Sequence, residues 1–131
     1  MSSSDTSKLT ALGQTVREGN RDLETFKAPD GIHKVKFTTD EITALCPLTG
    51  QPDWYQLELE YGPNELCLES KSLKLYLLTY RNQGDFCEAV ASQMRDHFVV
   101  ACKPKWLMVT LIAAARGGID ITATAGYEQP K

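Results

Sequence analysis

The chain has 131 residues, of which 42% are hydrophobic and 24% charged, and its formal net charge is −3. These values are typical of one soluble globular domain that is long enough to bury a core. The sequence has no basic tract interleaved with aromatic residues and no apolar run near the roughly 20 residues that span a bilayer, which argues against nucleic-acid and membrane partners. The N-terminus, MSSSDTSKLTAL, lacks the basic and apolar regions of a signal peptide, so we expect a cytoplasmic protein.

The first part of the chain predicts an arm, a strand, a loop and a second strand. Residues 1–28 are polar and mixed and are expected to form an N-terminal arm, with a single domain from 29 to 131. Alternation predicts a strand over Ile32 to Phe37, and the proline-rich and glycine-containing segment 46–53 predicts a loop. The clearest strand covers residues 54–61, WYQLELEY, and the side chains expected on its apolar face are Tyr55, Leu57, Leu59 and Tyr61.

Two helices are expected next. Helical spacing from Ser70 predicts a helix that ends at Asn82-Gln83-Gly84, with an apolar stripe of Leu73, Tyr76, Leu77 and Tyr80. A second helix is expected to begin with Asp85 as its N-cap and Glu88 in a capping box, and to end at Lys103-Pro104. The buried stripe predicted for it is Phe86, Val90, Met94, Phe98 and Ala101.

The last part of the chain predicts two more strands. Residues 106–115 are nearly all apolar, which is typical of a strand that is buried on both faces. Residues 119–125 alternate, with Ile119, Ile121 and Ala123 expected inward. The order strand, strand, helix, helix, strand, strand predicts an α+β fold with a four-stranded antiparallel sheet and both helices on one face. A symmetric oligomer whose sheets join into a barrel would cover the second face, so we expect a homo-oligomer.

The cysteines carry no metal or disulfide pattern. Their positions are Cys46, Cys67, Cys87 and Cys102, with no CxxC pair. Because His33 and His97 are the only histidines, a closed zinc site is poorly supported and we expect no metal. A disulfide framework is unusual in a cytosolic chain of this size, and an isolated cysteine most often serves as a small buried hydrophobic residue.

Cys46 is nevertheless a candidate nucleophile. It precedes a proline in the turn-rich segment CPLTGQPD, and Asp53 ends that segment. Loops on rigid scaffolds often hold catalytic groups, and a thiol with a nearby carboxylate can act as a nucleophile with its proton donor. An ordinary turn with an aspartate after proline is the plain alternative, and these residues alone leave both open.

Hydroxyl and ammonium groups gather at the start of the first predicted helix, in the segment ESKSLK from Glu69 to Lys74. Helix N-termini with serine and lysine suit phosphate groups. A capped, solvated helix end is the alternative. Arg116, beside two glycines, could likewise be a phosphate contact or an ordinary surface arginine.

Four segments together resemble the NADPH-dependent 7-cyano-7-deazaguanine reductases, the nitrile reductases of queuosine biosynthesis, in their single-module form. The most specific segment is ESKSLKLY, from Glu69 to Tyr76, which matches the family's hallmark at every position. The other three are CPLTGQPD from Cys46, RNQGDF from Arg81 followed by Glu88, and RGGI from Arg116. The resemblance runs from about Thr39 to Tyr127.

The resemblance implies a tunnel fold (T-fold), in which subunits join their sheets into a barrel and form sites at their interfaces. Cys46 aligns with the nucleophile that forms a covalent thioimidate, and Asp53 with the acid/base that protonates the nitrile nitrogen. NADPH is the implied cofactor and a deazapurine base the implied substrate. The implied cofactor-binding positions are Ser70, Lys71, Lys74 and Arg116. The implied substrate-binding positions are Glu88, Phe86, Glu69 and Ser70.

The implied reaction reduces the nitrile of 7-cyano-7-deazaguanine (preQ0) to the amine 7-aminomethyl-7-deazaguanine (preQ1), for the queuosine modification of tRNA. A nitrile carbon accepts hydride poorly, whereas a thioimidate accepts it more readily. Two hydrides are needed because the change from nitrile to amine takes four electrons. The imine formed between them must stay enclosed, or water would hydrolyse it.

The sequence departs from the family at Cys87, where histidine usually precedes the substrate-reading glutamate. A thiol with an ordinary pKa near 8.5 relays protons at neutral pH less well than imidazole. Val90 also departs, because some members carry a cysteine there that pairs with the nucleophile on oxidation. Cys87 could take over that pairing, or it could only fill space beside the base.

Three other functions compete with nitrile reduction. A nicotinamide-independent branch of the superfamily forms an amidine from the same nitrile, but its members lack the lysine-rich segment. A zinc-dependent pterin-type cyclohydrolase on this fold would need cysteine and histidine ligands together. A non-enzymatic oligomeric binding module would have no need of the Cys46 thiol.

Overall fold

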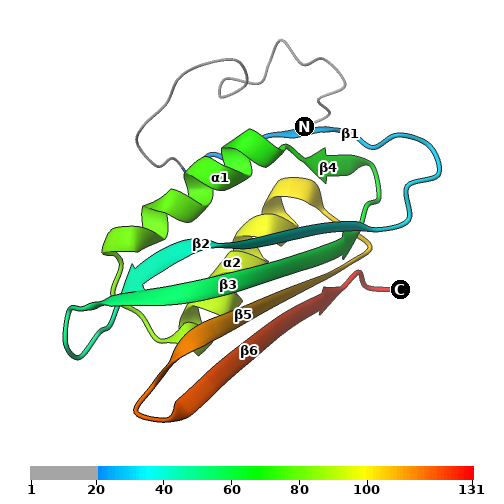
Figure 1. Cartoon of the computed structure of the whole chain (residues 1–131). Coiled ribbons are helices and arrows are strands. Elements are labelled where there is room, and N and C mark those ends of the chain that lie inside the picture. The colour runs from blue at the N-terminus through cyan, green and yellow to red at the C-terminus, as the bar shows by residue number, and fades with distance from the viewer. Residues whose placement is uncertain (1–20) are drawn as a thin grey trace.

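The computed structural model describes residues 21–131, apart from the side chains of residues 115 and 116. Strands β2, β3, β5 and β6 form one antiparallel sheet in that order, and β1 and β4 form a small second sheet. Figure 1 shows both long helices on one face of the larger sheet. The elements are β1 (Thr25–Lys27), β2 (Val35–Leu45), β3 (Pro52–Gly62), β4 (Leu66–Leu68), α1 (Ser70–Leu78), η2 (Thr79–Asn82), α2 (Cys87–Cys102), β5 (Trp106–Arg116) and β6 (Ile119–Glu128). The predicted α+β architecture is therefore confirmed.

The core lies between the larger sheet and the two helices. Successive residues of a strand point to opposite faces, so β3 sends every second side chain toward the helices. Those side chains are Tyr55, Leu57, Leu59 and Tyr61, and all are buried as the sequence predicts. Strand β5 lies beside β3 with Leu57 opposite Leu111 and Leu59 opposite Val109, which continues the apolar layer.

The prediction of a strand over Ile32 to Phe37 is wrong at both ends, because residues 32–34 lie before the strand and the strand is longer. β2 begins at Val35 and continues to Leu45, with a shift in register between Thr39 and Ile42. This shift in register interrupts the alternation of inward and outward side chains. The second half of the strand therefore does not continue the period-two pattern that predicts the first half. It leaves Ile42 and Ala44 facing the helices, where both are buried.

The first helix begins at Ser70, as predicted, and its last turn tightens into the 3₁₀ helix η2. Glu69 is the N-cap, and its carboxylate accepts hydrogen bonds from the backbone N–H groups of Lys71 (2.6 Å) and Ser72 (2.8 Å). The predicted apolar stripe is buried, while Leu78 is 36% exposed. A carboxylate at this position also suits the positive end of the helix dipole.

The predicted N-cap of the second helix is wrong by one residue. α2 begins at Cys87, and its N-cap is Phe86, whose side chain makes no capping hydrogen bond. The Asp85 carboxylate instead accepts a hydrogen bond from Nε2 of Gln83, at 2.7 Å. The prediction that Phe86 is buried is also wrong, because its side chain is 57% exposed. Val90, Met94 and Phe98 of the same predicted stripe are buried.

The second face of the sheet is open within the single chain. Leu107, Val109 and Leu111 of β5 face the helices and are buried, but Met108 on the other face is 42% exposed. In β6, Ile121 lies opposite Ala113 and Ala123 lies opposite Leu111, so both are on the helix face, as predicted. Burial is the part of this prediction that fails within one chain, because Ile119 is 68% exposed and Ile121 is 40% exposed. The covering of the second face by other subunits stays a prediction.

The end of the predicted N-terminal arm is joined to the domain. In β1, Thr25 lies opposite Leu68 of β4, and Glu69 N donates to Glu24 O at 2.9 Å. Residues 1–20 of the arm lie outside the described residues. Across residues 21–131, none of the helices has the length and apolar character needed to cross a membrane.

Candidate active site

Cys46 lies at the corner where β2 turns into β3. Its backbone N–H donates to Gln51 O at 2.7 Å, and its carbonyl accepts from Gly50 N at 2.8 Å. Gly50 has a φ of 70°, a left-handed conformation that glycine adopts without strain. These bonds close a tight turn that holds a partly exposed thiol at one end of the sheet.

The surroundings of Cys46 favour its thiolate. A hydrogen bond from the Thr49 side chain is the main cause that lowers the pKa of Cys46, followed by backbone hydrogen bonds from Leu48 and Thr49. Partial burial and the negative charge of Asp53 act in the opposite direction and are weaker. Because the thiolate is the nucleophilic form of cysteine, a lowered pKa increases the reactive fraction at neutral pH.

Asp53 follows Cys46 across the turn and lies in β3 opposite Ala44. Alternation along β3 places its side chain on the same face of the sheet as Tyr55. Its negative charge raises the pKa of both Cys46 and Cys87, although it is a minor cause for each. The structure therefore places the predicted acid/base, Asp53, close enough to the predicted nucleophile, Cys46, for its charge to act on the thiol.

Tyr55 belongs to the same cluster, although the sequence pattern predicts it only as a core residue. It is 3% exposed, and burial is the main cause that raises its pKa to about 12. The remaining causes are negative charges on Asp53, Cys87, Cys46 and Glu88. Its phenol is protonated at neutral pH and can donate a hydrogen bond toward the site. The two-residue spacing from Asp53 on a strand was the signal that could have revealed it.

The first turn of α2 brings Cys87 and Glu88 beside the same tyrosine. Cys87 is buried, and its Sγ donates to Leu111 O at 3.9 Å. Burial, followed by the charge of Glu88, raises the pKa of Cys87 to about 11. Glu88 is exposed at the positive end of the α2 dipole, and the neighbouring Phe86 side chain is largely exposed. Both side chains are accessible to a ligand.

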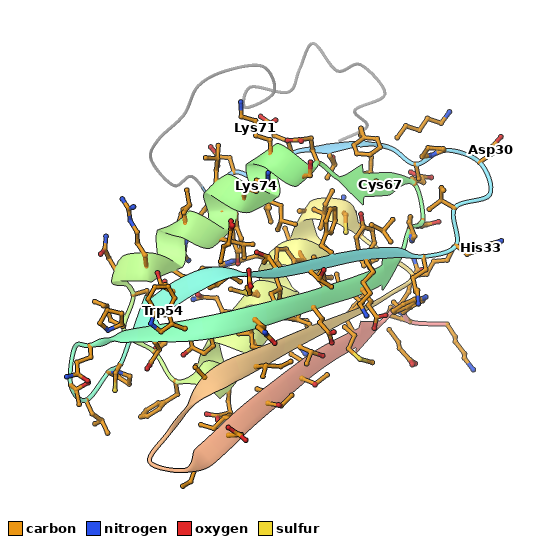
Figure 2. The ribbon with its side chains drawn as sticks, in the orientation of Figure 1. Asp30, His33, Trp54, Cys67, Lys71 and Lys74 are labelled. Carbon is orange, nitrogen blue, oxygen red and sulfur yellow. The ribbon has the colours of Figure 1, made fainter. Side chains whose placement is uncertain are left out.

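The lysine-rich segment lies elsewhere in the chain. Figure 1 shows the start of α1 near β4, whereas the corner that holds Cys46 lies at the opposite end of the sheet. Figure 2 shows Lys71 on the first turn of α1, far from Trp54 beside the Cys46 corner. Ser70 and Lys74 are exposed and Lys71 is partly exposed. Within one chain, these residues and Cys46 do not form a single site.

The start of α1 suits a phosphate group through its side chains. Glu69 is buried, and its carboxylate occupies the backbone N–H groups of Lys71 and Ser72. These two N–H groups are therefore not available to a phosphate, which changes the simple expectation for a helix N-terminus. The hydroxyl of Ser70 and the ammonium groups of Lys71 and Lys74 are donors of the kind that bind anionic oxygens. The chemistry of these donors fits the phosphates of a nicotinamide dinucleotide.

Arg116 ends β5, just before the turn at Gly117 and Gly118. Both glycines have positive φ, 62° and 80°, as a tight hairpin between β5 and β6 requires. The side chain of Arg116 lies outside the described atoms, so its proposed contact with the cofactor stays a prediction.

A hollow of about 560 Å³ opens near the Cys46 end of the sheet. It is lined by Trp54, Tyr55, Gln56, Ile112, Asp120 and Thr122, among others. Most of these side chains lie on the face away from the helices, but Tyr55 connects the hollow with the cluster around Asp53. Cys46 and Glu88 do not line it. Within one chain, the Cys46 thiol therefore lies outside this hollow.

The cluster offers no clear metal site. In the portion of the chain from residue 21 onward, no three His, Cys, Asp or Glu side chains are arranged to hold a metal ion. His97, which lies in α2, hydrogen-bonds Tyr76 through Nδ1 at 2.7 Å.

The fold and the cluster can be compared with known proteins. A solved structure described as the archaeosine synthase QueF-Like in the apo form superposes with a TM-score of 0.71, at 21% identity, and covers 80% of this chain and all of that one. The molecule therefore has the α+β tunnel fold expected from the sequence. The family model described as QueF-like protein matches residues 52–131. The chain belongs to the QueF-like family.

Several relatives carry the same name, NADPH-dependent 7-cyano-7-deazaguanine reductase. The protein from Nitrosococcus oceani is 47% identical over 113 residues, which are 85% of this chain and 88% of the relative. The protein from Syntrophus aciditrophicus is 46% identical over 128 residues, 96% and 91% of the two chains. The protein from Frankia casuarinae is 43% identical over 121 residues, 92% and 97% of the two chains.

Proposed function

We propose that this chain catalyses the NADPH-dependent reduction of 7-cyano-7-deazaguanine to 7-aminomethyl-7-deazaguanine. The main support is the 42–47% identity, over most of the chain, to relatives named for that reductase activity. The cluster of Cys46, Asp53 and Glu88 around Tyr55 supplies the side chains that this chemistry needs. The lysine-rich start of α1 supplies a place for the cofactor phosphates.

Cys46 begins the reaction as a nucleophile. Its thiolate sulfur forms a bond to the nitrile carbon, while one π bond of the nitrile breaks and the nitrogen gains a proton. The product is a thioimidate on Cys46. The hydrogen bonds from Thr49 and from the backbone favour the thiolate before the substrate binds.

NADPH supplies two hydrides when it is bound. These hydrides would bring the carbon bound to Cys46 to the oxidation level of the amine, while Cys46 leaves as the thiolate and the nitrogen gains protons. Ser70, Lys71, Lys74 and Arg116 are the residues proposed to hold the cofactor through its phosphates and ribose.

Asp53 is proposed to deliver the proton to the nitrile nitrogen. It lies across the turn from Cys46, and its negative charge acts on both Cys46 and Tyr55. Glu88 is proposed to accept hydrogen bonds from the guanine-like edge of the base, and Phe86 to stack against its plane. Glu69 acts on this site only indirectly in one chain, because its carboxylate caps α1.

The complete site is proposed to form between subunits of a cytoplasmic homo-oligomer. Within one chain, the start of α1 and the Cys46 corner lie at opposite ends of the sheet (Figure 1). A barrel made from several sheets would cover the open face and bring the two halves of the site together. The partners are then a small deazapurine base, NADPH and other copies of this chain, with no nucleic acid or membrane.

An assay of NADPH absorbance with the purified protein and 7-cyano-7-deazaguanine tests this function. We expect two NADPH to be consumed for each amine formed, with no consumption by Cys46→Ala. Formation of an amidine from ammonia without loss of NADPH would instead assign the chain to amidine synthesis. Binding without any product would favour a non-enzymatic binding module.

A further inference from the structure

A chain of hydrogen bonds runs through the layer between α1 and α2. The Tyr76 hydroxyl lies 2.7 Å from His97 Nδ1 and 2.8 Å from the Tyr80 hydroxyl. The Tyr80 hydroxyl donates to Gln93 Oε1 at 2.9 Å. Both tyrosines are fully buried, so each hydroxyl depends on these partners.

The chain continues from α2 into the loop that follows η2. Gln83 Nε2 donates to Gln93 Oε1 at 3.0 Å and to Asp85 Oδ2 at 2.7 Å. Gln83 Oε1 accepts a hydrogen bond from Arg21. A guanidinium can only donate and an ionised carboxylate can only accept, so these two charged neighbours fix which end of the Gln83 amide is nitrogen.

This orientation sets the direction of every other bond. Because Gln83 presents nitrogen to Gln93, Gln93 must present oxygen, and that oxygen can accept only. Tyr80 must therefore use its single proton for Gln93, and Tyr76 must donate to Tyr80. His97 must then carry a proton on Nδ1 and donate it in a hydrogen bond to the Tyr76 hydroxyl oxygen. The side chains form one directed chain with a single compatible arrangement of protons.

The Gln83 end of this chain contacts the residues on both sides of Cys46. Gln83 O accepts a hydrogen bond from Leu45 N at 2.9 Å. Gly84 forms a parallel bridge with Leu45. A Cβ on Gly84 would lie 3.7 Å from Leu45 O and 3.7 Å from Pro47 Cα, so the two backbones pack closely. The same loop leads directly into the first turn of α2.

We propose that Gln83 is a positioning residue that fixes the Cys46 corner relative to the first turn of α2, where Glu88 lies. Gln93, Tyr80 and Tyr76 hold the Gln83 amide in the one orientation that serves this purpose. The inference rests on the proposed role of Cys46 as the nucleophile. The buried Tyr76 and Tyr80 and the half-buried Gln83 and Gln93 act on the Cys46 corner through the backbone that they hold in place.

Matched glutamine substitutions test the direction of the chain. In Gln93→Glu, a carboxylate oxygen can still accept both hydrogen bonds, whereas Gln93→Leu removes both. In Gln83→Glu, the same change of amide to carboxylate places an acceptor against Asp85 and Gln93 Oε1, which are acceptors too. Both Gln93→Glu and Gln83→Glu replace an amide by a carboxylate. The first is expected to keep the chain of hydrogen bonds and the second to break it.

The readout is the rate at which 7-cyano-7-deazaguanine forms a covalent adduct on Cys46 without NADPH, followed by intact mass. We expect Gln83→Glu and Gln93→Leu to slow this step at least about tenfold, since small displacements of reacting groups cost this much or more. Gln93→Glu should recover a rate within about threefold of the unaltered protein. Circular dichroism and thermal midpoints confirm that each variant is folded at the assay temperature.

The outcomes separate this inference from the function on which it rests. A folded Gln83→Glu that forms the adduct at the unaltered rate would overturn the inference. Equal slowing by Gln93→Glu and Gln93→Leu would overturn it too, and this pair decides the matter if Gln83→Glu does not fold. Failure of the unaltered protein to form any adduct would instead remove the proposed role of Cys46, and the inference with it.

Discussion

Cys46 and Cys87 have opposite electrostatic surroundings, although both lie near Asp53 and Tyr55. Hydrogen bonds lower the pKa of Cys46, whereas burial raises the pKa of Cys87 to about 11. At neutral pH the thiolate population therefore belongs mainly to Cys46. The family resemblance singled out Cys46, but only the packing of α2 against β5 shows that Cys87 is buried and neutral.

Replacing Thr49 by valine tests the cause of the lowered pKa at Cys46. The substitution keeps the shape of the side chain and removes the hydroxyl that donates to the thiolate. The pKa of Cys46 should rise, so its thiolate fraction near pH 7 should fall. We expect iodoacetamide to modify Cys46 roughly two- to fivefold more slowly at pH 7, with rates converging at high pH. An unchanged pH profile would contradict this explanation.

Replacing Cys87 by serine tests whether its thiol relays a proton. Because a pKa of about 11 leaves the thiol neutral, it supplies little more than a weak donor to Leu111 O. We expect Cys87→Ser to consume NADPH within about threefold of the unaltered rate. A much larger loss would show that Cys87 takes part in the reaction. Non-reducing peptide mapping after mild oxidation decides separately whether a Cys46–Cys87 disulfide forms.

At the scale of elements, the sequence predicts the structure within one strand or helix better than it predicts the contacts between strands and helices. Alternation in β3 predicts its buried face because side-chain direction follows directly from strand geometry. Asp85 does not serve as the N-cap that the sequence predicts, because its carboxylate accepts a hydrogen bond from the Gln83 side chain. The proximity of Tyr55 to Glu88 likewise depends on how α2 packs on the sheet, and one-dimensional spacing does not contain that information.

Replacing Glu69 by alanine tests its role as the N-cap of α1. The substitution leaves the part-buried N–H group of Lys71 and the buried N–H group of Ser72 without their acceptor. We expect urea denaturation to show a loss of about 1–2 kcal/mol in the free energy of unfolding. Glu65→Ala, at an exposed position before β4, is the control and should change stability by less than about 0.5 kcal/mol. Equal stability of the two variants would argue against the capping role.

At the scale of the whole molecule, the sheet has an open face and two outer strands, β2 and β6. The predicted fold class follows from the order of apolar patterns, but the pattern cannot say how subunits meet. Exposed Ile119 and Ile121 in β6 lie on the same face as the partly buried Ala123. Their exposure in one chain is consistent with a subunit interface along β6.

The oligomer can be tested with two matched substitutions of exposed apolar residues. Light scattering should give the unaltered protein a mass that is a multiple of 14.6 kDa. Ile121→Glu should shift this mass toward one subunit and lower turnover by more than about tenfold, because a buried charge opposes assembly. Val100→Glu, on the outer side of α2 where Val100 is 75% exposed, should leave the mass unchanged. A monomeric, active unaltered protein would contradict the proposed shared site.

The most direct test of the central claim is the intact mass of the protein after mixing with 7-cyano-7-deazaguanine in the absence of NADPH. We expect a gain of one substrate molecule per chain, with the modified peptide containing Cys46. We also expect NADPH to remove this adduct and release the amine, and Cys46→Ala never to form it. An unaltered protein that consumes NADPH and yields the amine without a detectable adduct on Cys46 would contradict the covalent mechanism.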